Sequence, residues 1–188
     1  MKVINNAQIP DVKLITINPH HDNRGYFAET WNLKNHLEYG LPTNYAQDNI
    51  SKSSKNTLRG IHFQVEPFAQ GKLVGVAYGM VYDVAVDLRP DSSTFKQWVG
   101  YDLDPYRQLY IPPGFGHGFV VVSEEAIFTY KCTAPYSPEH QHSIIWNDPE
   151  IGIKWPTDKP VLAPKDKDAY DLKQWIIRYN LEQLRVET

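Results

Sequence analysis

The stretch VYDVAVDLR, residues 81–89, decides the fold class of this chain. Its side chains alternate between two rows, one made of Tyr82, Val84, Val86 and Leu88 and the other of Val81, Asp83, Ala85 and Asp87. A period of two is the pattern of a β-strand with one face in the core and one face in water. The sequence therefore predicts a half-buried strand here.

Similar short runs flank this strand between residues 55 and 133. They are LRGIHFQ (58–64), GKLVGVAYG (71–79), FKQWVGYDL (95–103), RQLYIPP (107–113), GFVVV (118–122) and AIFTYKCT (126–133). Turn material such as YGM, RPDSS, DLDPY and PPGFG separates them. Short strands at this spacing are typical of an antiparallel sandwich or barrel, so we expect an all-β domain with Greek-key or jelly-roll connections.

The sequence predicts only two helices. The first is short, lies in TWNLKNHLEYG (30–40) and ends at Gly40. The second lies in DAYDLKQWIIRYNLEQLR (168–185), where Leu172, Trp175, Ile176 and Tyr179 fall at helical spacing. We expect a single domain over residues 1–188, with a core of about 5–168 and a C-terminal helical tail of 169–188.

Composition restricts the classes of partner. A net charge of −3 creates no global field for nucleic acid, so an anionic ligand would need a local group of cations. Cys132 is the only cysteine, which excludes an intrachain disulfide and a thiolate zinc site. No apolar run has membrane-spanning length, and MKVINNAQIPDVK lacks the apolar region of a signal peptide. We expect a cytoplasmic protein that binds neither membrane nor nucleic acid.

The run LRGIHFQ carries polar groups inside an apolar strand. Strict alternation places His62 on the face of Gly60 and Gln64, and Arg59 on the opposite face. If Arg59 and His62 contact one ligand, either Gly60 marks a β-bulge or the two residues lie near the end of the strand. A single strand histidine is more often a satisfied structural residue, so this stretch alone leaves both interpretations open.

Two further strand residues allow the same pair of interpretations. Lys72 begins a row with Val74 and Val76, and it either extends to water at a sheet edge or points into a cavity. Tyr130 shares a face with Phe128, where a tyrosine is usually part of the core.

Polar residues in three further stretches add candidates for binding. The prolines and glycines of PPGFGHGF (112–119) hold His117 in what we interpret as a rigid loop. DNRGYFAE (22–29) places Arg24 and Glu29 on either side of a glycine turn, and QDNIS (47–51) offers Gln47 and Asn49. Arg24 and Arg59 are suited to binding a phosphate. Each of these residues alone also suits an exposed surface.

A metal site is not expected. His62 and His117 are possible ligands, but no carboxylate follows His62 at ligand spacing. His140 and His142 form an H-x-H, although the polar segment PYSPEHQHS around them is typical of an exposed loop.

Together these stretches resemble the nucleotide-sugar 3,5-epimerases, the family of dTDP-4-dehydrorhamnose 3,5-epimerase. The resemblance covers about residues 5–168, and the matching segments are ordered, which is more specific than any single motif. They are DNRGYFAE, QDNIS, TLRGIHFQ, QGKLV, VYDVAVDLR, LYIPPGFGHGF, YKCT, the region of Tyr136, WNDPEIGIKWP and LAPKD. The resemblance implies a cupin-type jelly roll, a nucleoside-diphosphate sugar as substrate, a homodimer, and no metal or organic cofactor.

The resemblance also implies roles for single residues. His62 matches the family's general base, Asp166 its carboxylate partner, Tyr130 the acid on the opposite face, and Lys72 the group beside the ketone oxygen. The substrate-contacting positions are Arg24, Glu29, Gln47, Asn49, Arg59, His117, Tyr136, Gln141 and Lys165. Gln141 departs from the glutamate common in the family, and Ala163 stands near a usual serine.

The implied activity is inversion of C3 and C5 of a nucleoside-diphosphate 4-keto-6-deoxy sugar, most simply a dTDP-linked one. The alternatives within enzymes are an epimerase of C3 only or C5 only, a ketoisomerase, and an enzyme for a GDP- or CDP-linked sugar or heptose. A sugar-binding jelly roll without catalysis is the alternative from another class. Such a binder would not need His62 and Tyr130 together, because it moves no proton.

Overall fold

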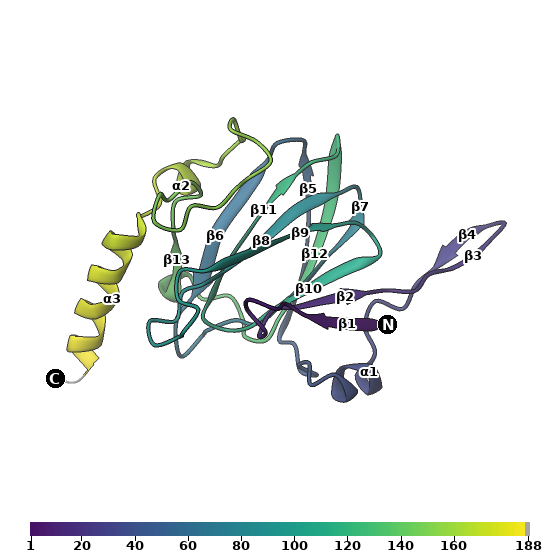
Figure 1. Ribbon diagram of the computed structural model, residues 1–188, viewed down its shortest axis with the longest axis horizontal. Coiled ribbons are helices and arrows are strands. Elements are labelled where there is room, and N and C mark those ends of the chain that lie inside the picture. The colour runs from purple at the N-terminus through teal and green to yellow at the C-terminus, as the bar shows by residue number, and fades with distance from the viewer. Residues whose placement is uncertain (187–188) are drawn as a thin grey trace.

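Two antiparallel sheets face one another in the computed structural model, which describes the backbone of residues 1–186 and the side chains of residues 1–180 (Figure 1). The six-stranded sheet has the order β1 (Lys2–Asn5), β2 (Lys13–Thr16), β10 (Arg107–Ile111), β7 (Lys72–Tyr78), β12 (Glu125–Cys132) and β5 (Gln47–Ser54). The five-stranded sheet has the order β13 (Gln141–Ser143), β6 (Leu58–Gln64), β11 (Phe115–Val121), β8 (Val81–Asp87) and β9 (Trp98–Leu103). The predicted all-β jelly roll is confirmed.

The main core lies between the two sheets. Val74 of β7 and Phe128 of β12 face Ala85 of β8 and Phe119 of β11. The rings of Phe119 and Phe128 stack with centroids 4.0 Å apart, which joins one sheet to the other. Apolar burial of this kind is the dominant stabilising contribution of a sandwich.

Strand β8 is buried on both faces, so the prediction of a half-buried strand was wrong. Its inward row includes Val81 and Ala85, and its outward row includes Val84 and Val86. The outward row is covered by the C-terminal part of the chain, where Trp175 of α3 (Leu172–Val186) joins a second core. Period-two patterning cannot reveal such a cover, because the covering residues are remote in the sequence.

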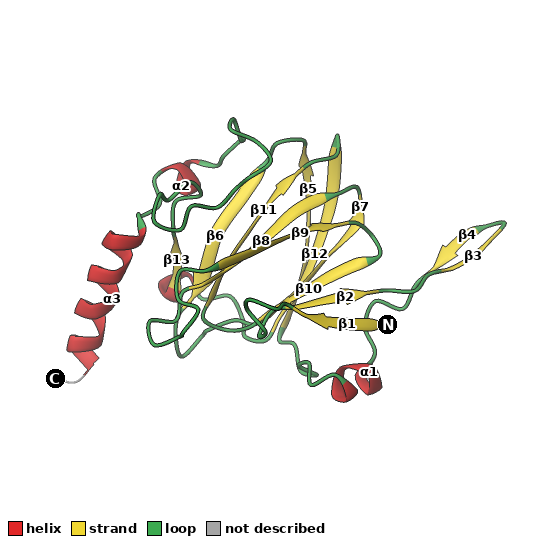
Figure 2. Cartoon of the chain, in the orientation of Figure 1, coloured by secondary structure: helices red, strands yellow, loops and turns green. Residues whose placement is uncertain are grey.

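Both predicted helices are present, and two further short ones were missed (Figure 2). Asn32 caps α1 (Leu33–Glu38) by accepting a hydrogen bond from the backbone of Asn35, and Gly40 follows with φ +61°. The missed elements are the 3-10 helix η1 (Pro138–His140) and α2 (Pro164–Lys167). Elements this short carry no readable periodicity.

Several strands lie where the sequence predicted a loop or no regular element. His117 lies inside β11, and the QDNIS stretch begins β5. His142 lies in β13, paired with Phe63 of β6 and only 8% exposed, so the end of the segment is not the exposed loop that was expected, whereas Tyr136 near its start is 53% exposed. The remaining unpredicted strands are β1, β2, β3 (His20–Asp22) and β4 (Gly25–Phe27).

Strands β3 and β4 form a hairpin that projects from the body of the molecule (Figure 1). Tyr26 and Phe27 on this arm are 49% and 71% exposed. The last two residues of the predicted C-terminal tail, 187–188, lie outside the described residues, and the boundary at residue 168 stays a prediction. No helix within residues 1–186 is both long enough and apolar enough to cross a bilayer.

A β-bulge at Gly60 decides on which side of β6 the side chains of Arg59 and His62 lie. The pairing of β6 with β11 runs from His62 opposite His117 to Arg59 opposite Phe119, so two residues of β6 face the single residue Gly118. Gly60 has φ +140°, and a Cβ there would collide with Gly118 and lie 2.9 Å from the carbonyl oxygen of His117. The extra residue returns Arg59 to the side of His62, which is the first of the two arrangements that the sequence left open.

Gly60→Ala is expected to destabilise the fold more than Gly25→Ala does. Both glycines have a similar φ, but a Cβ on Gly25 meets nothing within 4 Å. Gly25→Ala should therefore cost only backbone strain, about 1 kcal/mol of unfolding free energy. Gly60→Ala adds a backbone clash and should cost roughly 3 kcal/mol or more. Urea unfolding of the two variants measures the difference, and equal losses would show that β6 and β11 separate easily.

Candidate active site

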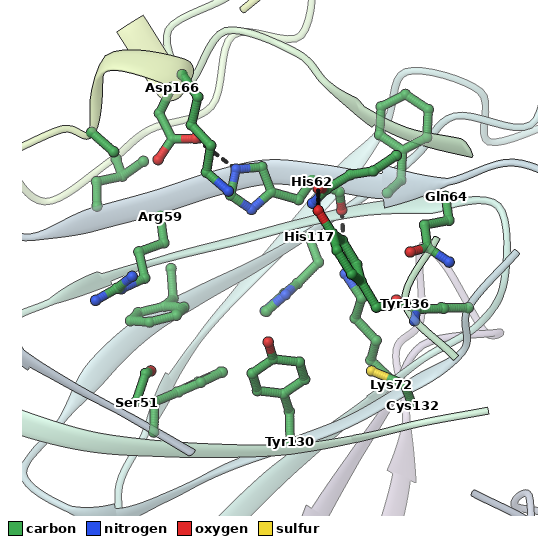
Figure 3. Close-up of a pocket in the computed structure, with 18 of the residues that line it drawn as sticks. Ser51, Arg59, His62, Gln64, Lys72, His117, Tyr130, Cys132, Tyr136 and Asp166 are labelled. Carbon is green, nitrogen blue, oxygen red and sulfur yellow. Dashed lines mark hydrogen bonds and ion pairs between the residues drawn. The ribbon is translucent and has the colours of Figure 1, made fainter. Parts of the chain in front are cut away.

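A cavity of about 520 Å³ opens between the two sheets (Figure 3). Strands of both sheets line it, together with the segment that contains α2. Most of the residues that the sequence predicted for the site lie on its wall: Gln47, Arg59, His62, Lys72, His117, Tyr130, Tyr136, Gln141, Lys165 and Asp166. The fold therefore collects residues that lie up to 119 positions apart in the chain, from Gln47 to Asp166.

His62 of β6 and Asp166 of α2 form a buried pair. Nε2 of His62 lies 2.6 Å from Oδ1 of Asp166, whose side chain is 2% exposed. Because an ionised carboxylate only accepts hydrogen bonds, Nε2 carries the proton, and Nδ1 presents its lone pair to the cavity (Figure 3). Burial lowers the pKa of His62 below 6.5, and the hydrogen bond and charge of Asp166 oppose that shift. The pair is thus a neutral base held in one tautomer.

Tyr130 of β12 faces the cavity from the other sheet (Figure 3). Its ring packs against Phe128, while its hydroxyl has no hydrogen bond to another described side chain. Burial raises the pKa of Tyr130 above 10.0, and the nearby charge of Arg59 only partly opposes this. Tyr130 therefore stays protonated at neutral pH and is a proton donor on the wall opposite His62.

Lys72 and His117 lie deeper in the cavity, beside the carboxylate of Asp83. Asp83 was not among the site residues predicted from the sequence. Nζ of Lys72 donates a hydrogen bond to the backbone oxygen of His62 at 3.4 Å. Nε2 of His117 lies 2.9 Å from Oδ2 of Asp83, which is fully buried. Burial lowers the pKa of Lys72 and raises that of Asp83, and their mutual attraction opposes both shifts. The sequence held no local signal that Asp83 points inward, because its row, with two aspartates, is the less apolar of the two rows of β8.

Amides and a tyrosine surround the other end of the cavity. Gln47 donates to Asn49 at 2.8 Å and accepts from the backbone of Tyr136 at 2.8 Å. The hydroxyl of Tyr136 donates to Oε1 of Gln141 at 2.9 Å. Asn49 thus lies beside the cavity, behind Gln47. Tyr136 is 53% exposed, so its ring is available to a ligand.

Gln64 lines the cavity and was not predicted as a site residue from the sequence. Its amide donates to the backbone oxygens of Phe68 and Pro135 and accepts from the backbone of Ser137. It thereby holds the loop that carries Tyr136. A polar residue at the end of a core strand was the available signal.

Arg24 and Glu29 do not reach the cavity of their own chain. Arg24 lies at the tip of the arm and pairs with Asp22 at 2.6 Å. Glu29 is exposed and accepts hydrogen bonds from Asn32 and Asn35. Arg24 and Glu29 cannot reach a substrate bound in the cavity of their own chain. Their predicted contact with a substrate therefore stays a prediction.

The described side chains offer no ready metal site. Nowhere in residues 1–180 do three histidine, cysteine, aspartate or glutamate side chains converge in a way that would hold an ion. The two cavity histidines each bind a separate carboxylate. The absence of a metal and of a cofactor stays a prediction.

Fold and site together define a cupin-type jelly roll with proton-transfer groups on facing walls. The family model for dTDP-4-dehydrorhamnose 3,5-epimerase matches residues 6–174. The chain therefore belongs to the dTDP-4-dehydrorhamnose 3,5-epimerase family, whose members are isomerases.

Individual relatives agree with this assignment. A dTDP-4-dehydrorhamnose 3,5-epimerase of Salmonella typhimurium is 49% identical, over 94% of this chain and 99% of that one. The crystal structure of dTDP-6-deoxy-D-glucose-3,5-epimerase from Legionella pneumophila in complex with dTDP-4-keto-L-rhamnose is 45% identical. Its TM-score is 0.87, and the match covers 92% of this chain and 93% of that one. A dTDP-4-dehydrorhamnose 3-epimerase of Streptomyces niveus is 40% identical, over 82% and 76% of the two chains.

The pH dependence of activity should report the His62–Asp166 pair. His62 acts as a base only when neutral, so kcat/KM should fall as the pH decreases through a midpoint below 6.5. Asp166→Asn removes the charge that raises the pKa of His62, so the midpoint should move to lower pH. The rate at neutral pH should fall about 10²-fold or more, because the tautomer is no longer fixed. Asp168→Asn, on an exposed residue just after α2, is the matched control, and an unchanged midpoint in Asp166→Asn would contradict the pairing.

Proposed function

We propose that this protein inverts C3 and C5 of dTDP-4-dehydro-6-deoxyglucose to give dTDP-4-dehydrorhamnose. The observation that carries the proposal is the position of His62 and Tyr130 on facing walls of one cavity (Figure 3). Inversion of a carbon requires that a proton leave one face and return to the other. A base and an acid on opposite walls provide that geometry.

His62 begins the reaction. C3 and C5 of a 4-keto sugar are both α to the carbonyl, so removal of either hydrogen gives an enolate with its charge on O4. Nδ1 of His62 accepts the proton, and Asp166 stabilises the imidazolium that forms. Its lowered pKa keeps His62 neutral and ready at physiological pH.

Lys72 stabilises the enolate with its ammonium group. It lies at the floor of the cavity and is 8% exposed, so water competes weakly for its charge. Asp83 holds His117 in place, and its negative charge offsets the buried positive charge of Lys72. Preorganised donors at a developing negative charge usually supply the largest share of catalysis.

Tyr130 completes each inversion. Its hydroxyl returns a proton from the face opposite His62, and its raised pKa keeps it protonated for that step. Arg59 and Lys165 at the cavity wall are cations suited to the diphosphate, and the exposed ring of Tyr136 suits stacking on the nucleotide base. Gln141 fixes the hydroxyl of Tyr136 and offers its own amide to the base.

A C3-only epimerase is the second candidate. The relative from Streptomyces niveus named as a 3-epimerase favours it, since the two chains share 40% identity. The two activities differ in which carbon exchanges its hydrogen. Incubation of the 4-keto nucleotide sugar in D₂O followed by NMR separates them, because a C3-only enzyme leaves the C5 hydrogen in place.

We also propose a homodimer whose arms complete the sites. The β3–β4 arm projects from the body and carries Arg24 beside the exposed rings of Tyr26 and Phe27 (Figure 1). Exposed aromatic residues on a projecting hairpin are typical of an interface. A second copy of the chain is the occupant that would bring Arg24 and Glu29 to a cavity. The cytoplasmic location stays a prediction.

Tyr130→Phe should separate proton exchange from inversion. Phenylalanine keeps the ring but removes the donor, while His62, Asp166 and Lys72 still form the enolate. Deuterium should enter the sugar, whereas inversion should slow by roughly 10²–10⁴-fold, the usual contribution of a positioned acid. NMR follows both events in one tube. Inversion at the wild-type rate would show that Tyr130 is not the proton donor and has only a structural role.

Mixing two inactive variants tests the shared site. His62→Ala removes the base from the cavity, and Arg24→Ala removes the cation from the β3–β4 arm. In a heterodimer one site combines an intact body with an intact arm, so random mixing restores about a quarter of wild-type sites in a two-fold dimer. Activity at low substrate concentration measures the recovery after co-refolding. A mixture no more active than its components would mean that Arg24 does not act in the site of a second chain.

A further inference from the structure

The inward row of β5 is polar where a core strand is usually apolar. Gln47, Asn49, Ser51 and Ser53 lie opposite the inward residues Cys132, Tyr130, Phe128 and Ala126 of β12. Gln47 and Ser51 line the cavity. Ser53 lies behind the wall and is 7% exposed. A buried hydroxyl normally has a specific partner, because leaving it unpaired costs free energy.

The partner of Ser53 is Arg59. Nε of Arg59 donates a hydrogen bond to Oγ of Ser53 at 3.1 Å. This bond joins β5, in one sheet, to β6, in the other. Among the described side chains, the bond to Ser53 is the one hydrogen bond of this guanidinium, so its two terminal nitrogens keep their hydrogens for a ligand (Figure 3).

No carboxylate among the described side chains forms an ion pair with Arg59. Arg24 and Arg89, by contrast, are each paired with an aspartate. An arginine without a carboxylate partner has many rotamers, and fixing one of them on ligand binding costs entropy. The bond to Ser53 reduces that cost because it fixes the plane of the guanidinium beforehand.

We propose that Ser53 is a positioning residue that holds the guanidinium of Arg59 toward the diphosphate of the nucleotide sugar. The proposal rests on the proposed function, because it needs a substrate with a diphosphate. Ser53 touches neither the reacting carbons nor the sugar and acts only through Arg59.

The position of Arg59 also bears on the acid. The positive charge of Arg59 lowers the pKa of Tyr130, against the larger effect of burial. A guanidinium held at the cavity wall therefore contributes to both binding and proton transfer. Through its hydrogen bond with Arg59, Ser53 therefore affects both diphosphate binding and proton transfer.

Calorimetric titration with dTDP and with thymidine tests the proposal. Ser53→Ala should weaken dTDP binding on the order of 10-fold, the value of a hydrogen bond to a charged group. Thymidine binding should not change, because thymidine has no diphosphate. Ser53→Thr keeps the acceptor and should restore dTDP binding. Ser54→Ala, on the exposed neighbour that faces outward on the same strand, is the matched control.

A double-mutant cycle separates positioning from general damage. In an Arg59→Ala background, Ser53→Ala should cause no further loss of dTDP affinity. A further loss there, an equal loss of thymidine affinity, or normal dTDP binding by Ser53→Ala would each overturn the proposal. Arg59→Lys keeps the charge without the planar fork and should weaken dTDP binding as Ser53→Ala does, which tests the idea even if Ser53→Ala does not fold.

The wild-type protein tests the underlying function separately. If it binds dTDP no more tightly than thymidine, the diphosphate role of Arg59 fails, and with it part of the proposed function. If the wild-type preference for dTDP is present and Ser53→Ala retains it, only the positioning role of Ser53 fails.

Discussion

The close contact of Gly60 with Gly118 is the constraint on which the site depends. Two strands can approach this closely only where neither residue carries a Cβ, and here the approach coincides with an extra residue in β6. The bulge reverses the alternation between Arg59 and His62, so both side chains reach the cavity. A regular strand would have sent one of them to the outer core, among Ile61 and Phe63.

Burial then gives the cavity residues their chemical roles. Withdrawal from water disfavours the charged form of every group, so it lowers the pKa of His62 and raises the pKa of Tyr130. The base is kept unprotonated and the acid is kept protonated by one physical effect acting on groups of opposite type. Asp166 limits the effect for His62, because its hydrogen bond and its charge stabilise the imidazolium.

Sequence patterning identified the central strands well and the peripheral ones poorly. The run LRGIHFQ has the bounds of β6, since its polar residues did not hide the apolar ones. Strand β5 was missed because its inward row is polar, and the first half of β11 was interpreted as a loop because Gly116 and Gly118 flank His117. Those glycines are required by packing: a Cβ on either would meet Ile61. Turn composition and close strand packing both require glycine, so composition could not separate them.

By itself, the sequence determined the fold class, the family and the residue types of the site, because alternation, turn residues and ordered motifs are local or linear properties. Tertiary structure alone decided which of these residues meet. It paired His117 with Asp83, buried both faces of β8, placed Ser53 behind Arg59, and left Arg24 on an arm away from the cavity. The physical reason is that contact, burial and the resulting pKa depend on neighbours that are distant in the chain, and no local pattern records them.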